Sequence, residues 1–81
     1  MLKIEIISPL GYVFEGSCFM AVIPCIAGEI GVMQNHEAFV SLLKEGKISI
    51  YNEKQEIVKE VDVKSGFAEI NDGKKLIVLV D

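Results

Sequence analysis

An 81-residue chain provides one small domain, and a domain of this size buries only about 60% of the surface of its unfolded state. Hydrophobic residues form 51% of the sequence, aromatic residues only 7%, and tryptophan is absent, a composition that favours β-strands over aromatic stacking platforms. The net charge of −4 argues against a nucleic-acid partner, because phosphate contacts require clustered lysine and arginine.

The first part of the chain is predicted to form two strands. Apolar and charged residues alternate over residues 2–7, the period of a half-buried strand, and the Ser-Pro-Leu-Gly of residues 8–11 then makes a turn. A second strand is expected from Tyr12 to Ile23, with Gly16 at a bulge or sharp bend. Both faces of its far half, residues 19–23, are apolar, so we expect other groups to cover both.

The segment from Ile26 to Val40 has features that folding alone does not require. Pro24 is expected to end the preceding strand, because proline has no N–H to donate to a ladder. Gly28 and Gly31 bracket Glu29 and an isoleucine, so the backbone can bend sharply and present one carboxylate at a tip. The only histidine follows, between an asparagine and a glutamate. The sequence therefore predicts a site of contact or chemistry in this segment.

Short strands are expected in the middle of the chain. Residues 30–33 are compatible with one, and residues 38–43 with either a single helical turn or a short buried strand, of which the strand is favoured. Gly46 marks a turn, and residues 47–50 alternate as a strand does.

A hairpin is predicted next. Asn52-Glu53-Lys54 forms its connection and residues 56–63 its second strand. The alternation slips near Lys59 and Glu60, which indicates a bulge.

The last two strands, residues 67–70 and 76–80, are joined by an Asn-Asp-Gly turn whose residues tolerate positive φ, and the final run is apolar on both faces. Turn signals recur about every eight to twelve residues and no long helical period is present. The sequence predicts an all-β fold, a small antiparallel β-sandwich or flattened barrel of about eight to ten short strands. We expect a single domain over residues 1–81.

No run approaches the roughly 20 apolar residues of a membrane span, and Lys3 and Glu5 interrupt any signal-peptide pattern, so a cytoplasmic protein is expected. Cys18 falls in a predicted strand and Cys25 in the loop after the proline. Neither has a second pair of ligands at zinc spacing. We expect reduced, packed thiols, no metal site and no cofactor.

Glu29, His36 and Glu37 are the candidates for acid–base catalysis. Such chemistry needs converging groups and a pocket, and a small sandwich leaves little room for a cavity of roughly a few hundred cubic ångströms. No serine or cysteine lies in a nucleophile elbow, and no glycine-rich phosphate loop precedes a helix. We therefore expect neither enzyme activity nor a small-molecule ligand.

The apolar faces of residues 19–23 and 76–80 exceed what a small core needs. Mixed charges along residues 44–64 are typical of solvated edge strands and need no further explanation. A small domain with surplus apolar surface is usually a subunit of an assembly.

The run Gly28-Glu29-Ile30-Gly31-Val32, followed by His36 five residues after its last glycine, resembles the signature loop of the epsilon subunit of F-type ATP synthases. The N-terminal β-sandwich of that family is similar to the whole chain. The supporting matches are Ile4-Glu5-Ile6-Ile7-Ser8-Pro9, Phe14-Glu15-Gly16, Val22-Ile23-Pro24, Leu43-Lys44-Glu45-Gly46, Ser65-Gly66-Phe67-Ala68-Glu69-Ile70 and Val78-Leu79-Val80-Asp81. Their order and spacing make the joint match specific.

The resemblance implies a non-catalytic rotor subunit of a proton-translocating ATP synthase. In the family it lies at the foot of the central stalk, peripheral on the cytoplasmic face of the bacterial inner membrane, and couples the proteolipid ring to the gamma subunit for ATP synthesis. Glu29 matches the family position that meets the polar loop of the ring, and His36 matches one that faces gamma. The implied ring contacts are Ile26, Gly28, Glu29, Ile30 and Gly31, and the implied gamma contacts are Gln34, Asn35 and His36.

Two departures from the family pattern matter. Gln34-Asn35 stands where the family usually has Pro-Gly, and because asparagine tolerates positive φ, the turn is expected to survive without the rigidity of proline. Lys64-Ser65-Gly66 stands where the family usually has Ser-Gly-Gly.

The family's C-terminal helical hairpin, which regulates the enzyme in many members, would begin just after Asp81. The chain as given is expected to assemble and couple but not to inhibit by hairpin extension, and apolar surface on the Leu76–Val80 side is expected to be exposed.

The alternative is a stand-alone β-sandwich adaptor or ligand-binding module. It predicts a concave pocket lined with aromatic residues, whereas the aromatic residues of this sequence are scattered and mostly at core-facing positions.

Overall fold

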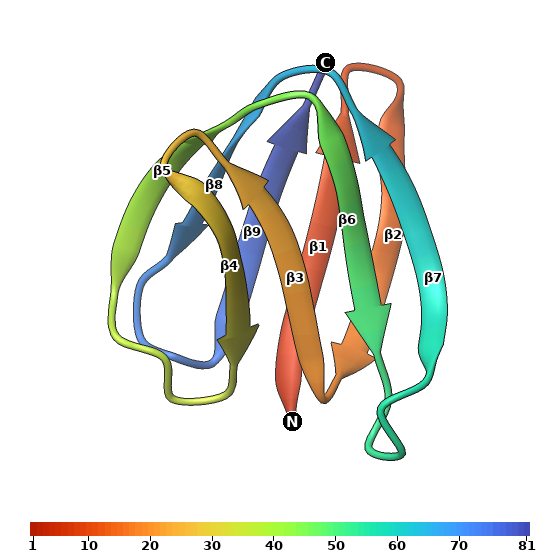
Figure 1. The fold of residues 1–81 in the computed structure, drawn as a ribbon, viewed down its shortest axis with the longest axis vertical. Coiled ribbons are helices and arrows are strands. Elements are labelled where there is room, and N and C mark those ends of the chain that lie inside the picture. The colour runs from red at the N-terminus through yellow and green to blue at the C-terminus, as the bar shows by residue number, and fades with distance from the viewer.

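The computed structural model describes all 81 residues and contains nine strands and no helix (Figure 1). This confirms the predicted all-β class and strand number. The strands are β1 (Leu2–Ser8), β2 (Gly11–Cys18), β3 (Met20–Cys25), β4 (Gly28–Met33), β5 (Phe39–Leu43), β6 (Gly46–Tyr51), β7 (Ile57–Val63), β8 (Gly66–Ile70) and β9 (Lys75–Val80).

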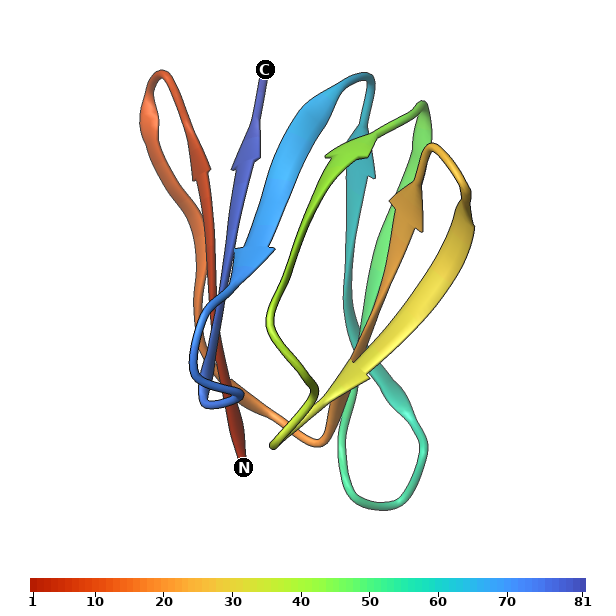
Figure 2. The ribbon, with the colours of Figure 1, turned by 90° about the vertical axis from the view of Figure 1, so that its left-hand side faces the viewer.

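The strands form one curled sheet that folds into two layers. Its order is β2-β1-β9-β8-β5-β3-β6-β7, and β4 pairs with β3 beside this path. Figure 2 shows the layers from the side, with β1, β2, β8 and β9 in one, β3, β4, β6 and β7 in the other, and β5 running between them. Every pair is antiparallel except β1 with β9, which are parallel.

The core between the layers is entirely apolar. It consists of 18 buried hydrophobic residues, and no polar or charged side chain is buried. The predicted alternation of the first strand is confirmed, because Leu2, Ile4 and Ile6 are fully buried. On β9, Leu76 and Val78 take the same role. Packing of these side chains stabilises the contact between the layers, with a contribution of about 25 cal/mol per Å² of buried apolar surface.

The predicted single strand from Tyr12 to Ile23 is wrong, because the chain changes layer at Phe19. Cys18 and Ala21 both face the core, and this spacing of three cannot occur in one regular strand, where every second residue shares a face. The Phe19 N–H instead donates to the Tyr51 carbonyl of the second layer, at 2.9 Å. Of the apolar run over residues 19–23, only Phe19 lies at the crossing; in β3, Ala21 and Ile23 are buried in the core, whereas Met20 and Val22 on the other face are half-buried.

Pro24 does not end its strand, contrary to the prediction, but lies within β3 opposite Glu29. Its carbonyl accepts the Lys44 N–H at 2.9 Å, so its backbone groups point away from β4. On that side β3 changes partner, from β6 at Val22 to β5 at Cys25. No ladder bond needs a donor at this position, so proline is tolerated.

The hairpin between β6 and β7 is confirmed, with its bulge slightly displaced. The side chain of Asn52 accepts the N–H groups of Lys54 and Glu56, at 2.9 and 3.0 Å. Ile50 pairs with Lys59 and Tyr51 pairs with Ile57, so β7 has one extra residue between these two partners. The bulge therefore lies one residue before the predicted position.

The loop after β4 and the loop between β8 and β9, at the lower end of Figure 1, are joined by a backbone hydrogen bond. The Asn35 N–H donates to the Gly73 carbonyl at 2.6 Å, and the φ of 70° at Asn35 confirms that asparagine takes the left-handed conformation here. A Cβ on Gly73 would lie 2.8 Å from the Asn35 Cα, so only glycine allows this approach.

Gly66→Ala is expected to lower the free energy of unfolding by about 3 kcal/mol, because its new Cβ would overlap the Leu79 carbonyl oxygen of the neighbouring strand. Urea denaturation of the two proteins measures the difference. Gly16→Ala is the matched control, since its Cβ meets only the Phe14 ring, at 3.4 Å. Equal losses in the two variants would contradict the steric argument.

Both cysteines are buried and unpaired, and Cys25 ends β3 instead of lying in a loop, as the sequence had suggested. Burial raises the pKa of the Cys18 thiol, which lowers its thiolate fraction. Iodoacetamide at pH 8 is expected to modify the native protein at least about tenfold more slowly than the urea-unfolded protein. Mass spectrometry over time reads the modification, and equal rates would show that the thiols are accessible.

Candidate interaction surfaces

The β3–β4 hairpin presents an apolar tip at the upper end of the fold (Figure 1). Ile26 and Ala27 form its turn, and Gly28 follows with a φ of 132°, a conformation open to glycine and strained for other residues. The Ile26 N–H donates to the Leu42 carbonyl at 3.0 Å, which fixes the tip against β5. Ile26 is 60% exposed, so the hairpin ends in an exposed apolar group.

Glu29 lies inside a strand and not at the predicted tip. β4 begins at Gly28, two residues earlier than the sequence indicated, because all six of its residues pair with β3. Of the two glycines, only Gly28 has positive φ, and Gly31 is part of the strand. The Glu29 side chain is exposed and Ile30 packs partly against the core. The five predicted ring-contact residues therefore form the tip and the first half of one edge strand.

Gln34, Asn35 and His36 lie together at the opposite end of β4. The His36 N–H donates to the Met33 carbonyl at 3.1 Å, which closes the turn. Nδ1 of His36 lies 2.8 Å from the carbonyl oxygen of Glu37. The His36 ring also packs edge-on against the Phe39 ring, with centroids 5.2 Å apart. These contacts hold the imidazole at the surface in one orientation.

A cavity of 500 Å³ opens beside this turn. Its lining combines apolar and polar side chains, and it was not anticipated, because these residues come from four separate parts of the sequence. Its lining consists of Met1, Phe19, Met33, Gln34, Asn35 and Glu53.

Glu29 and His36 do not converge on a common centre. Between Glu29 and Met33 alone the strand rises by about 13 Å, and the turn carries His36 beyond that point. An acid–base pair requires hydrogen-bond reach to one substrate, so these two residues do not form one. The structure also brings together no group of three His, Cys, Asp or Glu side chains able to hold a metal ion.

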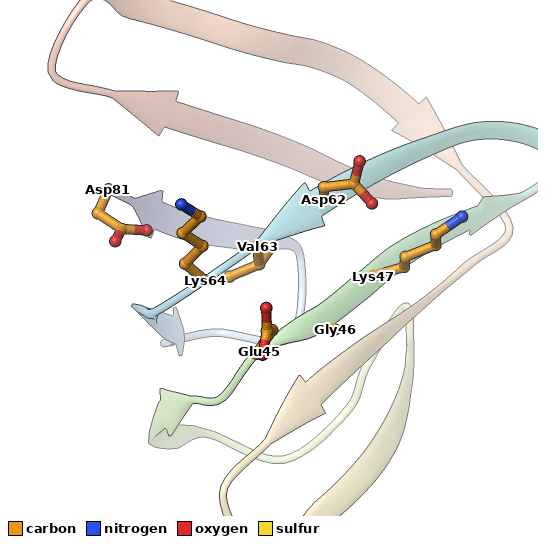
Figure 3. Close-up of a pocket in the computed structure, with 7 residues that line it drawn as sticks. All are labelled: Glu45, Gly46, Lys47, Asp62, Val63, Lys64 and Asp81. Atoms are coloured by element: carbon orange, nitrogen blue, oxygen red, sulfur yellow. The ribbon is translucent and has the colours of Figure 1, made fainter.

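Two other hollows are lined by charges of both signs. One of 280 Å³ contains the ion pair of Lys75 with Glu5, 2.8 Å between Nζ and Oε2, and this hydrogen bond raises the pKa of Lys75. The other, of 680 Å³, lies where β6, β7 and the C-terminus meet (Figure 3). There the Ser65 N–H donates to the Asp81 carboxylate at 3.1 Å and lowers the pKa of Asp81. The lining residues are Glu45, Gly46, Lys47, Asp62, Val63, Lys64 and Asp81.

An apolar row crosses the outer face of the first layer. The strand register places one apolar residue from each of five neighbouring strands side by side, and Leu79 at its centre is 46% exposed. The Leu76–Val80 strand therefore exposes apolar surface, as the sequence indicated. The full row could not be read from the sequence because it depends on four registers. Its members are Leu42, Phe67, Leu79, Ile7 and Tyr12.

The aromatic-lined pocket that a ligand-binding module would require is not among these features. Across the three cavities, Phe19 is the only aromatic lining residue. The surfaces with exposed apolar or directional groups are instead the hairpin tip, the turn at the lower end of β4 and the outer row, all of which suit protein contacts.

Comparison with known proteins agrees with this reading. The sequence profile of the family described as "ATP synthase, Delta/Epsilon chain, beta-sandwich domain" matches residues 1–81. The ATP synthase epsilon chain of Campylobacter curvus (strain 525.92) is 39% identical over 80 residues, which cover 99% of this chain and 60% of that protein. The epsilon chain of Sulfurimonas denitrificans is 38% identical, with the same coverage. The chain thus spans 60% of the length of these relatives.

Solved structures share the fold. A chain in the Euglena gracilis mitochondrial ATP synthase structure of OSCP, F1 and c-ring superposes with a TM-score of 0.86 at 20% identity, covering 98% of this chain and 49% of that one. A chain in the central stalk and c-ring structure from Tetrahymena thermophila gives a TM-score of 0.75 at 12% identity, covering 98% and 62%. The fold contains no helix long and apolar enough to cross a membrane. The family match over residues 1–81 confirms the resemblance seen in the sequence: this chain belongs to the β-sandwich domain family of ATP synthase delta and epsilon chains.

Proposed function

We propose that this domain is a non-catalytic part of the rotor of an F-type ATP synthase and couples the proteolipid ring to the gamma subunit. The observation that supports the proposal is that the residues expected to meet the ring and those expected to meet gamma lie toward opposite ends of β4, at the hairpin and at the turn after Met33. A part that transmits rotation needs two separate contacts on a rigid body. An all-apolar core between two layers supplies that rigidity.

The ring contact is assigned to the hairpin. Ile26 contributes an exposed apolar group, and Glu29 a carboxylate that can meet basic or amide groups on the ring surface. Gly28, Ile30 and Gly31 lie beside these two residues and complete the proposed ring contact. Rim charges of this kind set orientation and approach more than affinity.

The gamma contact is assigned to Gln34, Asn35 and His36. The two amide side chains line the rim of the 500 Å³ cavity, and the imidazole is held in place by Phe39. Hydrogen-bonding groups beside an apolar hollow are the usual composition of a protein interface. The domain would reach the cytoplasmic face of the bacterial inner membrane through these partner subunits, without cofactor, metal or small-molecule ligand.

The double variant Gln34→Ala/His36→Ala is expected to bind purified gamma subunit about tenfold more weakly than the original domain, because it removes two contacts near the centre of the interface. Calorimetric titration at fixed salt gives the two Kd values. Ser17→Ala, exposed on β2, is the control and should bind as the original does. Absence of any gamma binding by the original domain would overturn the proposed function.

Glu29→Gln is expected to reduce ATP-driven proton pumping only partly, because a single exposed rim contact contributes about 1 kcal/mol or less. Each domain is added to vesicles that carry enzyme depleted of the epsilon subunit, and the proton pumping that it restores is measured. Glu29→Gln combined with Ile26→Ser should lose more than either single variant, since the contact is shared over the tip. Complete loss of coupling from Glu29→Gln alone would contradict a contact made of several small contributions.

A further inference from the structure

The free edge of β4 carries a row of unpaired backbone groups. β4 pairs only with β3. The backbone groups of Pro24 point away from β4, since the Pro24 carbonyl accepts the Lys44 N–H at 2.9 Å. Glu29 lies opposite Pro24, and in an antiparallel pair of this kind both residues direct N–H and C=O away from each other. The N–H and C=O of Glu29 therefore face outward.

This orientation repeats at every second residue along the edge. The register of β3 and β4 runs through six pairs without a shift, so Gly31 and Met33 point outward as Glu29 does. The Met33 carbonyl accepts the His36 N–H at 3.1 Å. The N–H groups of Glu29, Gly31 and Met33 and the first two carbonyls are left for another strand.

The other two edge strands are protected and β4 is not. β7 exposes Lys59, Glu60 and Asp62 and contains the bulge described above. β2 has a register shift against β1. β4 has no shift and one charged residue, Glu29. Proteins protect free edges with charges and bulges, because an open edge recruits other chains, so an unprotected edge indicates a partner strand.

We infer that the free edge of β4 accepts an extended segment of the gamma subunit as an additional strand. The inference rests on the proposed function, which assigns gamma to Gln34–His36, the residues that directly follow β4. A gamma segment that meets this turn and continues along β4 needs no second interface. Added strands of this kind obtain affinity from backbone hydrogen bonds and specificity from alternate side chains.

The outer face of β4 determines the sequence of the added strand. The Glu29 carboxylate is assigned to the ring, so Glu29 offers only its outward N–H and C=O to the added strand. Gly31 has no side chain, and Met20 Sδ would lie only 3.3 Å from a Cβ there, so a large apolar or aromatic residue can cover Gly31 and contact the sulfur. Met33 leads into the 500 Å³ cavity and favours an apolar residue. The expected gamma segment has a large apolar residue opposite Gly31 and an apolar residue opposite Met33.

Gly31→Pro tests the edge without touching the fold's own ladder. The Gly31 N–H makes no bond to β3, so proline removes the donor offered to the partner, and its new Cβ meets only the flexible Met20 side chain, at 3.3 Å from Sδ. Glu60→Pro is the matched control. One cross-strand row runs through Gly31, Val22, Ser49 and Glu60, and the backbone N–H groups of its two end residues both point to free edges of the sheet. In calorimetric titration, Gly31→Pro is expected to bind gamma at least about tenfold more weakly than the original domain, and Glu60→Pro within about twofold of it.

Hydrogen exchange of the original domain gives a second readout that needs no variant, should Gly31→Pro fail to fold. The amides of Glu29, Gly31 and Met33 are expected to exchange quickly in the free domain and to become protected in the gamma complex, whereas the Glu60 amide stays fast. If gamma binds while these three amides remain fast, the inference is overturned and the proposed function stands. If gamma does not bind, both the inference and the proposed function are overturned.

Self-association provides a further test of the occupant. The domain alone is expected to remain monomeric in sedimentation at the concentrations of the titration. A dimer that Gly31→Pro, and not Glu60→Pro, converts to monomer would assign this edge to a second copy of the chain and would overturn the inference.

Discussion

The junction between the two layers depends on how β5 and the residues after it meet β3. β5 pairs along its length with β8 in the first layer and at one position, Leu43 with Cys25, with β3 in the second. Just beyond, a Cβ on Gly46 would lie 2.9 Å from the Pro24 Cβ, so the chain fits against β3 only as glycine. This packing sets the direction in which the β3–β4 hairpin leaves the fold, and with it the positions of the proposed contact groups.

Much of the fold could be predicted because its signals are local. Alternation over residues 2–7 and turn residues such as Asn52 act within a few residues, and the structure places both as expected. The crossing at Phe19 could not be predicted in the same way, because an apolar run continues through it and only the parity of Cys18 and Ala21 marks the change of layer. Pro24 was misread because its tolerance depends on which strand lies on each side.

The candidate site, like the fold, could be predicted from the sequence only in part. The contact roles that the family resemblance implies for residues from Ile26 to His36 stay a prediction, and the glycines suggested a bent loop where the structure has a regular strand from Gly28 to Met33. Local conformational freedom permits a bend without requiring one, and pairing with β3 decides the outcome. The outer apolar row and the cavity beside Met33 join residues distant in sequence, so only the register of the strands reveals them.

The single parallel pair in the sheet affects how the chain can fold. β1 lies between β2 and β9, so the second neighbour of the first strand to be synthesised is the last of the nine. The earlier hairpins can form on the ribosome, yet one edge of β1 stays unpaired until β9 has emerged. Closure over so long a sequence separation costs entropy before it yields contacts, so this pair is expected to form late and slowly.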